Sequence, residues 1–390
     1  MEPAIIAPSA DPFRPYRSVG YALALCIIAV SCAEVIRNIA APTSLDFASF
    51  WGAAKLALAG TPSLAYDNAA LHAVQLKVAA FDGGEMPFPY PPAFLLVVIP
   101  FAVLPFPFAM ALWSTVTLSI YVWVARRFAP GSGWLAVAFP PVFVIAAIGQ
   151  NGFITAALFL GGLGLLQRDR KFAAGLALGC LIVKPQLALM LPVAMLAGRE
   201  WRAITGAMLS STAAMLLGLI SFGPVTSWAW LHQMPLYMRI AREGLVGWHK
   251  LVSVYAASRQ AGFDEHTALV LHCVVAAVAA VLVAWSWRSD ARPMAKAGVL
   301  GAATMLASPY VYLYDALVLI PAFVWLVQRR VPTVLVGSLW LMPIVIIAQT
   351  AQNSGPVNIG PLLPMTILAI YLLWGRECPR DRFPMQYHPH

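Results

Sequence analysis

Long apolar segments alternate with short polar connections along the whole chain. Apolar stretches such as 21–30 and 272–284 lie within longer segments that nearly reach the roughly 20 residues needed by a bilayer-spanning helix. Other apolar segments are shorter and broken by proline, which is tolerated where neighbouring helices or a water-filled cavity satisfy the freed backbone groups. The pattern therefore predicts an all-α, polytopic transmembrane helical bundle with an internal cleft.

The basic residues predict how these helices are oriented. They cluster at Arg126 and Arg127, at Arg168, Arg170 and Lys171, at Arg199 and Arg202, at Arg288, Arg292 and Lys296, at Arg329 and Arg330, and after Arg376. The positive-inside rule places all these clusters in the cytoplasm, which predicts about 12 spans with both termini inside. Segment 92–125 contains three prolines and is expected to be either one kinked span or a re-entrant piece followed by a span.

We expect residues 1–375 to form a single integral-membrane domain in the bacterial inner membrane and residues 376–390 to form a basic cytoplasmic tail. Two long loops, 39–90 and 223–265, are predicted on the periplasmic side. The first loop is predicted to contain two amphipathic helices that lie along the membrane interface, split by a turn at 60–63. Thr43 or Ser44 is the expected N-cap of the first of them.

Composition excludes several classes of protein. Hydrophobic residues make up 61% of the chain and charged residues 11%, a balance unlike that of a soluble domain. The net charge of +9 is spread over the connections, so no nucleic-acid partner is expected. The five cysteines form no CxxC pair, and the chain has no glycine-rich phosphate loop and no HExxH or GxSxG motif. We therefore expect neither a metal nor a cofactor.

Asp46 is the first candidate for chemistry because it follows the first span and begins an aromatic segment with Phe47, Phe50 and Trp51. A carboxylate at that depth is costly unless it has a partner or a function. It could act as a general base that takes a proton from a hydroxyl group. The alternative is a helix N-terminal carboxylate, which the helix dipole stabilises by up to about 1 kcal/mol.

Lys184 is the second candidate, since it lies between two short apolar helices on the predicted periplasmic side. An ammonium group there suits a lipid phosphate, whereas the alternative is a side chain that extends to the membrane interface. Gln150 and Asn151 are candidates for substrate contacts or for helix caps. The run 308–315 contains Tyr312, Tyr314 and Asp315. Its tyrosines are expected either to line a cavity or to belong to an interfacial aromatic belt.

Several separated segments resemble glycosyltransferase family 87. They are Leu45-Asp46-Phe47, Trp51-Gly52-Ala53-Ala54, Leu58-Ala59-Gly60, Ala65-Tyr66-Asp67, Phe88-Pro89-Tyr90-Pro91-Pro92, Leu104-Pro105, Gly149-Gln150-Asn151, Ala174-Gly175-Leu176 and Lys184-Pro185. Their order and spacing are retained over most of the chain. The resemblance implies a GT-C fold and an inverting transferase that takes a sugar from a polyprenyl-phosphate donor, with mannose favoured and arabinose, glucose or another hexose left open. The acceptor would be a lipid or glycan at the periplasmic face, in cell-envelope biosynthesis.

The resemblance implies that Asp46 is the catalytic base, because the catalytic aspartate of the family lies in the first outer loop. Cations would stabilise the departing lipid phosphate, with Lys184 as the first candidate and Arg239, Arg242 and Lys250 as further ones. The residues expected to bind substrate are Tyr90, Gln150, Asn151, Trp248, His249, Tyr312, Tyr314 and Asp315. Many relatives have a histidine-rich segment where this chain has Tyr312, Tyr314 and Asp315, so the acceptor is left open.

Two other functions are compatible with the same residues. A transporter or flippase of lipid-linked sugars would use the same basic cavity without bond chemistry, and would place its polar site near the middle of the membrane. A structural membrane subunit would tolerate changes at Asp46 and Lys184 together.

Overall fold

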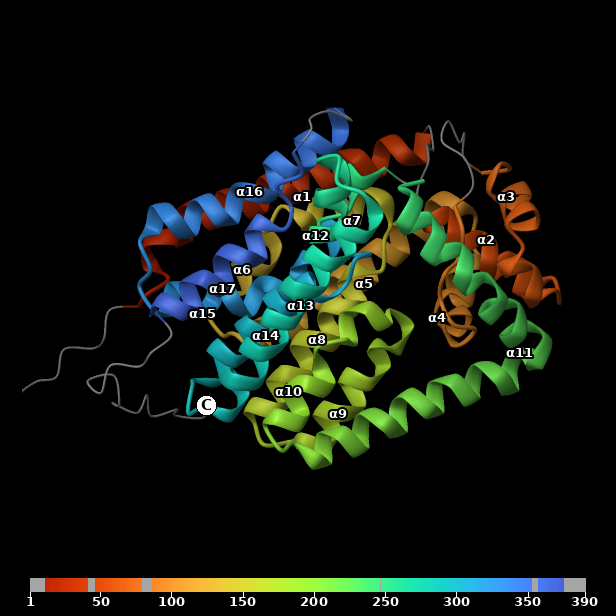
Figure 1. Ribbon diagram of the computed structural model, residues 1–390. Helices are drawn as coiled ribbons and strands as arrows, with labels where there is room; N and C mark the ends of the chain where they lie inside the picture. Colours follow the sequence, from red (N-terminus) through yellow and green to blue (C-terminus); the bar gives the residue numbers. More distant parts are fainter. Residues whose placement is uncertain (1–10, 41–45, 79–85, 246, 353–356, 375–390) are drawn as a thin grey trace, which may run out of the picture.

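The computed structural model describes residues 11–40, 46–78, 86–245, 247–352 and 357–374. Every regular element in these ranges is a helix (Figure 1). The first part of the chain forms α1 (Arg17–Ala40), α2 (Asp46–Leu58), α3 (Asn68–Gln75), α4 (Ala93–Ala102) and α5 (Phe106–Phe128). The middle forms α6 (Gly133–Ala138), α7 (Pro141–Ile148), α8 (Gly152–Gln167), α9 (Lys171–Gly179), α10 (Leu191–Ala197) and α11 (Trp201–Glu243).

The last part forms α12 (Val254–Gln260), α13 (Glu265–Arg288), α14 (Pro293–Ala307), α15 (Ile320–Gln328), α16 (Thr333–Gln352) and α17 (Leu362–Trp374). Short 3-10 helices join them, namely η1 (Arg14–Tyr16), η2 (Pro62–Tyr66), η3 (Cys180–Val183), η4 (Pro185–Ala188), η5 (Trp248–Lys250) and η6 (Leu313–Leu319). The connections are polar or contain proline and glycine, which end one helix and start the next.

Five helices of the described chain are long and apolar enough to cross a membrane. They are Arg14–Glu34, Phe106–Phe128, Trp201–Ile240, Glu265–Arg288 and Thr333–Ala351. Six further apolar helices are shorter, namely Ala93–Ala102, Gly152–Gln167, Lys171–Val183, Pro185–Ala197, Leu313–Gln328 and Leu362–Trp374. The all-α membrane prediction agrees with this set of helices, while the count of about 12 spans stays a prediction.

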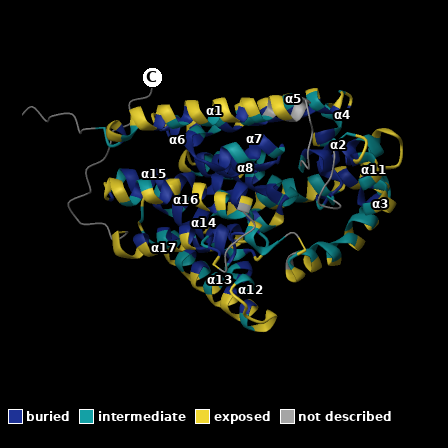
Figure 2. Cartoon of the chain, turned by 90° about the horizontal axis from the view of Figure 1, so that it is seen from above, coloured by how far each residue is buried: buried dark blue, intermediate teal, exposed yellow. Residues whose placement is uncertain are grey.

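The core consists of helices that are buried on every side. In α14 and α15 nearly every side chain is buried, and α7 and α8 are dark in the view of Figure 2, whereas α1 carries a long exposed stripe. A helix surrounded by other helices and one that faces lipid are equally apolar in sequence, so hydropathy alone does not separate them. A second, smaller core joins α2, α4 and the start of α5 through aromatic side chains such as Phe50, Phe94 and Trp113.

Segment 92–125 consists of two helices. α4 has 10 residues and is too short to cross a bilayer, while α5 has 23 residues and is long enough. The first helix ends at Ala102, and after a break at 103–105 the second begins at Phe106, with the extended Pro105 as its N-cap residue. One continuous kinked helix is therefore excluded, and the segment forms a short helix followed by a helix long enough to span a membrane, while the crossing itself stays a prediction.

The structure of the first predicted loop, 39–90, differs from the prediction of two interfacial helices. A turn does separate α2 from η2 near Gly60, but Phe47 to Ala54 are all buried. Because the first half of α2 is enclosed on all sides, the prediction that this helix is amphipathic and lies along an interface is wrong. In α3 the buried side chains are Leu71 and Gln75, so this helix does have one buried face. The N-cap predicted at Thr43 or Ser44 lies outside the described residues.

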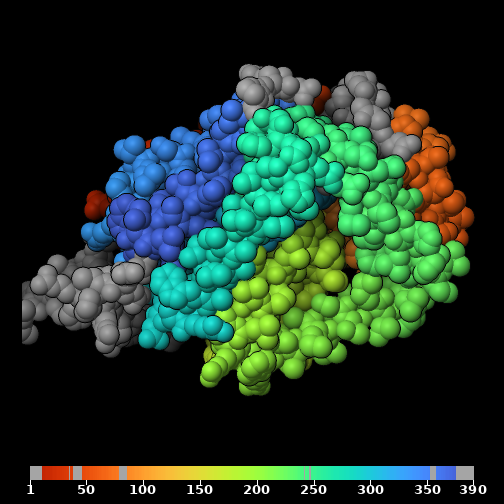
Figure 3. All heavy atoms as spheres, viewed as in Figure 1, coloured from red at the N-terminus to blue at the C-terminus, as the bar shows by residue number. Residues whose placement is uncertain are grey.

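The second predicted loop begins at the expected place, because the helix is broken at Gly223, but much of the loop is helical, since a second helical arm runs on to Glu243. Gly223 has φ 80° and ψ 169°, which is not a helical conformation, and it precedes Pro224, so α11 consists of two helical arms that meet at a kink. The first arm of α11 packs on α9, and the second arm reaches η2 (Figure 1). On the face drawn in Figure 3, the surface is hollowed between the bent α11 and helices α12 and α13.

Candidate active site

Asp46 is the first residue of α2 and keeps part of its surface accessible. The next residue, Phe47, is fully buried against Gly149, where a Cβ atom would lie 2.5 Å from the Cβ atom of Phe47. Gly149 has φ 69°, a left-handed conformation that favours glycine and that ends α7. This close approach places the beginning of α2 directly beside the turn between α7 and α8.

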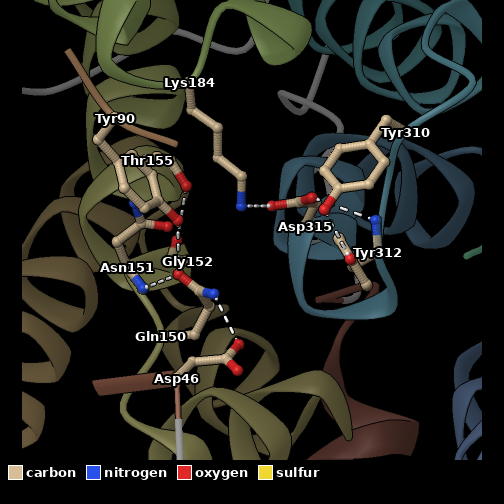
Figure 4. Close-up of polar contacts among 10 residues, drawn as sticks. All are labelled: Asp46, Tyr90, Gln150, Asn151, Gly152, Thr155, Lys184, Tyr310, Tyr312 and Asp315. Atoms are coloured by element: carbon tan, nitrogen blue, oxygen red, sulfur yellow. Dashed lines mark hydrogen bonds and ion pairs between the residues drawn. The ribbon is translucent and has the colours of Figure 1, made fainter. Parts of the chain in front are cut away.

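That turn supplies the hydrogen-bond partner of Asp46. The side-chain amide of Gln150 donates to Oδ2 of Asp46 at 2.8 Å, and its carbonyl oxygen accepts from the hydroxyl of Tyr90 at 3.1 Å (Figure 4). The same carbonyl accepts from the backbone N–H of Asn151 at 2.8 Å. Because both ends of the amide are bonded, its orientation is defined, and so is the direction of the Asp46 carboxylate.

Asn151 occupies the N-cap position of α8 but makes no capping hydrogen bond with its side chain, so the capping interpretation is wrong for this residue. Its side chain is fully buried beside the Tyr90 hydroxyl, but its Nδ2 and Oδ1 atoms make no hydrogen bond of normal geometry with the described residues. Buried polar atoms without partners are rare and costly, and they call for an explanation such as a ligand or an ordered water. Asn151 is therefore a strong candidate for contact with a polar substrate.

Lys184 lies between η3 and η4 and is buried, with a side chain 3% exposed. Its Nζ atom lies 2.5 Å from Oδ1 of Asp315 and 4.5 Å from the centre of the Tyr314 ring. The alternative that this lysine extends to the membrane interface is therefore wrong. A lysine with a carboxylate partner already has its charge balanced, which changes what it offers to a phosphate.

Asp315 joins this ion pair to the wall of the site. Its Oδ2 atom accepts from the backbone N–H of Tyr312 at 3.3 Å, so the carboxylate also orders the start of η6. Tyr312 donates from its hydroxyl to the hydroxyl of Tyr310 at 2.9 Å, and its ring stacks on Tyr314 at 4.8 Å. The tyrosines thus pack on one another beside a charged pair, which does not fit a belt that faces the membrane interface.

The segment after η5 pairs with the tyrosine segment. Leu251 forms an antiparallel bridge with Tyr312, and the backbone N–H of Val252 donates to the carbonyl of Val311 at 2.9 Å. Asn358 supports η5 by donating to the carbonyl of Trp248 at 3.1 Å, and Thr350 donates to that of His249 at 3.1 Å. These contacts hold the exposed Lys250 at the edge of the site.

Burial and the neighbouring groups have opposing effects on the proton affinity of Asp46. Burial raises the pKa of Asp46 above its usual range, while the hydrogen bond from Gln150 and the charges of Lys184 and Lys250 partly offset that increase. Burial also raises the pKa of Tyr90 and of Tyr312, so both stay protonated and able to donate hydrogen bonds. Burial and Lys250 lower the pKa of His249, which favours its neutral form.

The structure brings most of the predicted residues together. In Figure 4, Asp46, Gln150, Asn151 and Tyr90 lie on one side, Asp315, Tyr310 and Tyr312 lie on the other, and Lys184 extends between them. Arg242 does not join this group, because its side chain is exposed and paired with Glu265 at 3.2 Å. Arg239 is exposed too, and no contact in the described chain links it to these residues. The indole of Trp248 lies under Arg259 at 4.7 Å.

Tyr310 was not among the predicted site residues. It alternates with Val311 in an extended segment, and alternate residues of extended backbone point to the same side. The two-residue spacing of Tyr310 and Tyr312 could therefore have predicted that both side chains face the site. Within the described ranges, no group of three or more His, Cys, Asp and Glu side chains could hold a metal ion.

Comparison with known protein families gives one match. The model described as glycosyltransferase family 87 matches residues 88–309, which is more than half of the chain. The matched range includes Tyr90, Gln150, Asn151, Lys184 and Lys250, begins after Asp46, and ends just before Tyr310. No curated protein matches the chain, and no solved structure matches it either.

Proposed function

The chain belongs to glycosyltransferase family 87, and from this premise we propose that it is an inverting transferase that uses a polyprenyl-phosphate sugar. The donor sugar we propose is mannose, and the acceptor is a hydroxyl of a lipid or glycan at the periplasmic face of the inner membrane. The observation that carries the proposal is the Asp46 carboxylate, oriented by Gln150 toward a space bordered by Lys184 and the tyrosines (Figure 4).

In the proposed reaction, Asp46 accepts the proton of the acceptor hydroxyl as its oxygen attacks the anomeric carbon of the donor sugar. The new glycosidic bond forms on the face opposite the phosphate, and the bond between the anomeric carbon and the phosphate oxygen breaks. Both electrons of that bond leave with the polyprenyl phosphate, so the configuration inverts. A raised pKa suits this role, because a base is most effective when its pKa lies near the working pH.

The leaving phosphate gains negative charge, so cations that are in place beforehand would lower the barrier. Lys250 is exposed at the edge of the site, and its charge acts on Asp46, which makes it available to a phosphate. Lys184 would contribute in a different way, since Asp315 already balances its charge. We propose that Lys184 donates from a remaining N–H to a phosphate oxygen while Asp315 holds it in place.

A polyprenyl chain also needs an apolar surface beside the site. The inner side of the bend in α11 forms a groove of about 360 Å³, lined by Ser211, Thr212, Met215, Leu216, Leu219 and Ser227. The hydroxyl of Ser211 donates to the carbonyl of Gly179 at 2.9 Å, and Gly179 precedes Lys184 by the single 3-10 turn η3. The groove therefore adjoins the end of α9, five residues before Lys184 in the chain.

The test is a transfer assay with the full chain reconstituted in liposomes, supplied with labelled polyprenyl-phosphate mannose and an extract of cell-envelope lipids. We expect a labelled glycosidic product and free polyprenyl phosphate in equal amounts. Labelled donor that crosses the bilayer without any product would instead support a transporter or flippase. Mass spectrometry of envelope lipids and glycans with and without the gene would identify the product.

A further inference from the structure

A second groove lies far from Asp46, between α1, α5 and α6. It has a volume of about 660 Å³ and is lined by Ile28 of α1, by Leu118, Val122 and Trp123 of α5, and by Arg126 and Arg127 at the end of α5. Pockets that hold small ligands commonly measure roughly 300–1,000 Å³. We call this space the arginine groove.

The arginine groove lies at the opposite end of the bundle from the candidate active site. α5 begins at Phe106, whose ring lies 5.7 Å from that of Phe47, the residue after Asp46. The helix then runs for 23 residues, or about 34 Å at 1.5 Å per residue, before it ends with Arg126 and Arg127. That length matches the roughly 30 Å of a bilayer core, so the arginines reach the other leaflet.

Neighbouring side chains hold the two arginines at the groove, and no carboxylate in the described chain balances their charge. None of the ion pairs in the described part of the chain involves Arg126 or Arg127, and both are exposed. The guanidinium of Arg127 lies over the ring of Trp123 at 4.4 Å, which holds it against the groove. The stem of Arg126 lies against Gly133, where a Cβ atom would come within 2.5 Å of its Cγ atom.

A third guanidinium adds to this positive end. Arg168 donates to the carbonyl of Arg127 at 2.6 Å and to that of Gly164 at 3.0 Å, so it is fixed beside the end of α5. The rest of the groove is apolar, with Leu118, Val122 and Ile28 extending from the arginines toward the middle of the membrane. The distance from Leu118 to Arg126 along α5 is about 12 Å, close to the thickness of one leaflet.

We propose that the arginine groove binds one anionic phospholipid. Its phosphate would lie between Arg126 and Arg127, and an acyl chain would lie along Leu118 and Val122. An apolar groove with cations at one end is complementary to a lipid of this kind, because basic pockets between helices on the cytoplasmic side select acidic head groups. The proposal is independent of the transfer reaction, since the groove and Asp46 lie at opposite ends of α5.

The experiment measures lipid retention on the full-length protein by native mass spectrometry, after exchange with equal amounts of phosphatidylglycerol and phosphatidylcholine. We expect the protein to retain phosphatidylglycerol preferentially. The double variant Arg126→Gln/Arg127→Gln should bind it about 30-fold more weakly, the factor that corresponds to about 1 kcal/mol for each arginine. The matched control Arg202→Gln/Arg288→Gln removes two exposed arginines of other helices and should retain the lipid.

A further variant distinguishes lipid binding in the groove from attraction of the lipid by surface charge alone. Ser119 is exposed and lines the groove, so Ser119→Trp should fill it while both arginines stay in place, and retention should fall. Equal retention by Ser119→Trp and the unchanged protein would overturn the proposal, and so would equal losses in the two arginine double variants. Displacement of the lipid by millimolar inorganic phosphate would overturn it as well, because a phosphate site without an acyl chain would then suffice.

Discussion

Asp46 and Asp315 lie on opposite sides of the same site, but their partners differ. Asp315 faces the ammonium group of Lys184 and the backbone N–H of Tyr312, so its charge is balanced. Among the described residues, Asp46 has the neutral amide of Gln150 as its hydrogen-bond partner, and the nearby lysines act on it from a distance. A carboxylate with a full ionic partner is a poor proton acceptor, whereas one with a single amide partner keeps a lone pair free. The difference supports the base role that we propose for Asp46 and a positioning role for Asp315.

The largest effect on sugar transfer is expected when the proposed base is removed. Asp46→Asn keeps the shape and a partner for Gln150 but cannot accept a proton, so transfer should fall by about 10³-fold. The measurement is product formation in the liposome assay, with melting temperature as the check on folding. Asp67→Asn is the matched control, since Asp67 caps α3 and asparagine also caps helices well. Normal turnover by Asp46→Asn would remove Asp46 as the base.

The second effect concerns stability at the other carboxylate. Lys184→Met alone leaves Asp315 charged and buried, and Asp315→Leu alone does the same to Lys184, so each should destabilise the fold by about 3–5 kcal/mol. The double variant Lys184→Met/Asp315→Leu removes both charges and should recover most of that loss. Unfolding by denaturant in detergent measures this coupling. Additive losses in the double variant would show that the pair is not coupled.

The third prediction tests the hydrogen bond from the Gln150 amide to Asp46. Gln150→Met removes the hydrogen bond that lowers the pKa of Asp46, so that pKa should rise further. The base acts only when deprotonated, so activity is lost as pH falls through this pKa, and the acid limb of the rate profile should move to higher pH. At neutral pH we expect a loss of about 10-fold. A pH profile of kcat/KM checks this, and an unmoved limb would contradict the contact.

The smallest effect is expected at Lys250. Lys250→Gln removes an exposed charge at the edge of the site, so KM for the donor should rise by about fivefold, in line with roughly 1 kcal/mol for an exposed pair. Lys250→Arg keeps the charge and should behave almost normally. Arg239→Gln serves as the control for a cation outside the group around Asp46. If it raised KM as much as Lys250→Gln, the effect would be one of overall charge.

Much of the candidate site could be predicted because its residues are chemically unusual in an apolar chain. Asp46 and Lys184 stand out against 61% hydrophobic composition, and a polar group there needs a partner or a function. Tyr310 lies in the run 308–315 that the sequence singled out, but only Tyr312, Tyr314 and Asp315 of that run were named as substrate contacts. The prediction that α2 lies at the membrane interface was wrong. Asp46 and Lys55 give the helix polar ends, but its middle packs against α4 and α5.

Hydropathy and charge along the chain were sufficient to predict an all-helical membrane protein and to single out the carboxylate and the lysine, because the cost of placing charge in lipid acts on each segment separately. Only the tertiary structure decided that Lys184 pairs with Asp315 and Gln150 with Asp46, across 131 and 104 residues of chain. Such partners are chosen by helix packing, through contacts like that of Phe47 with Gly149, and local sequence does not determine which helices become neighbours.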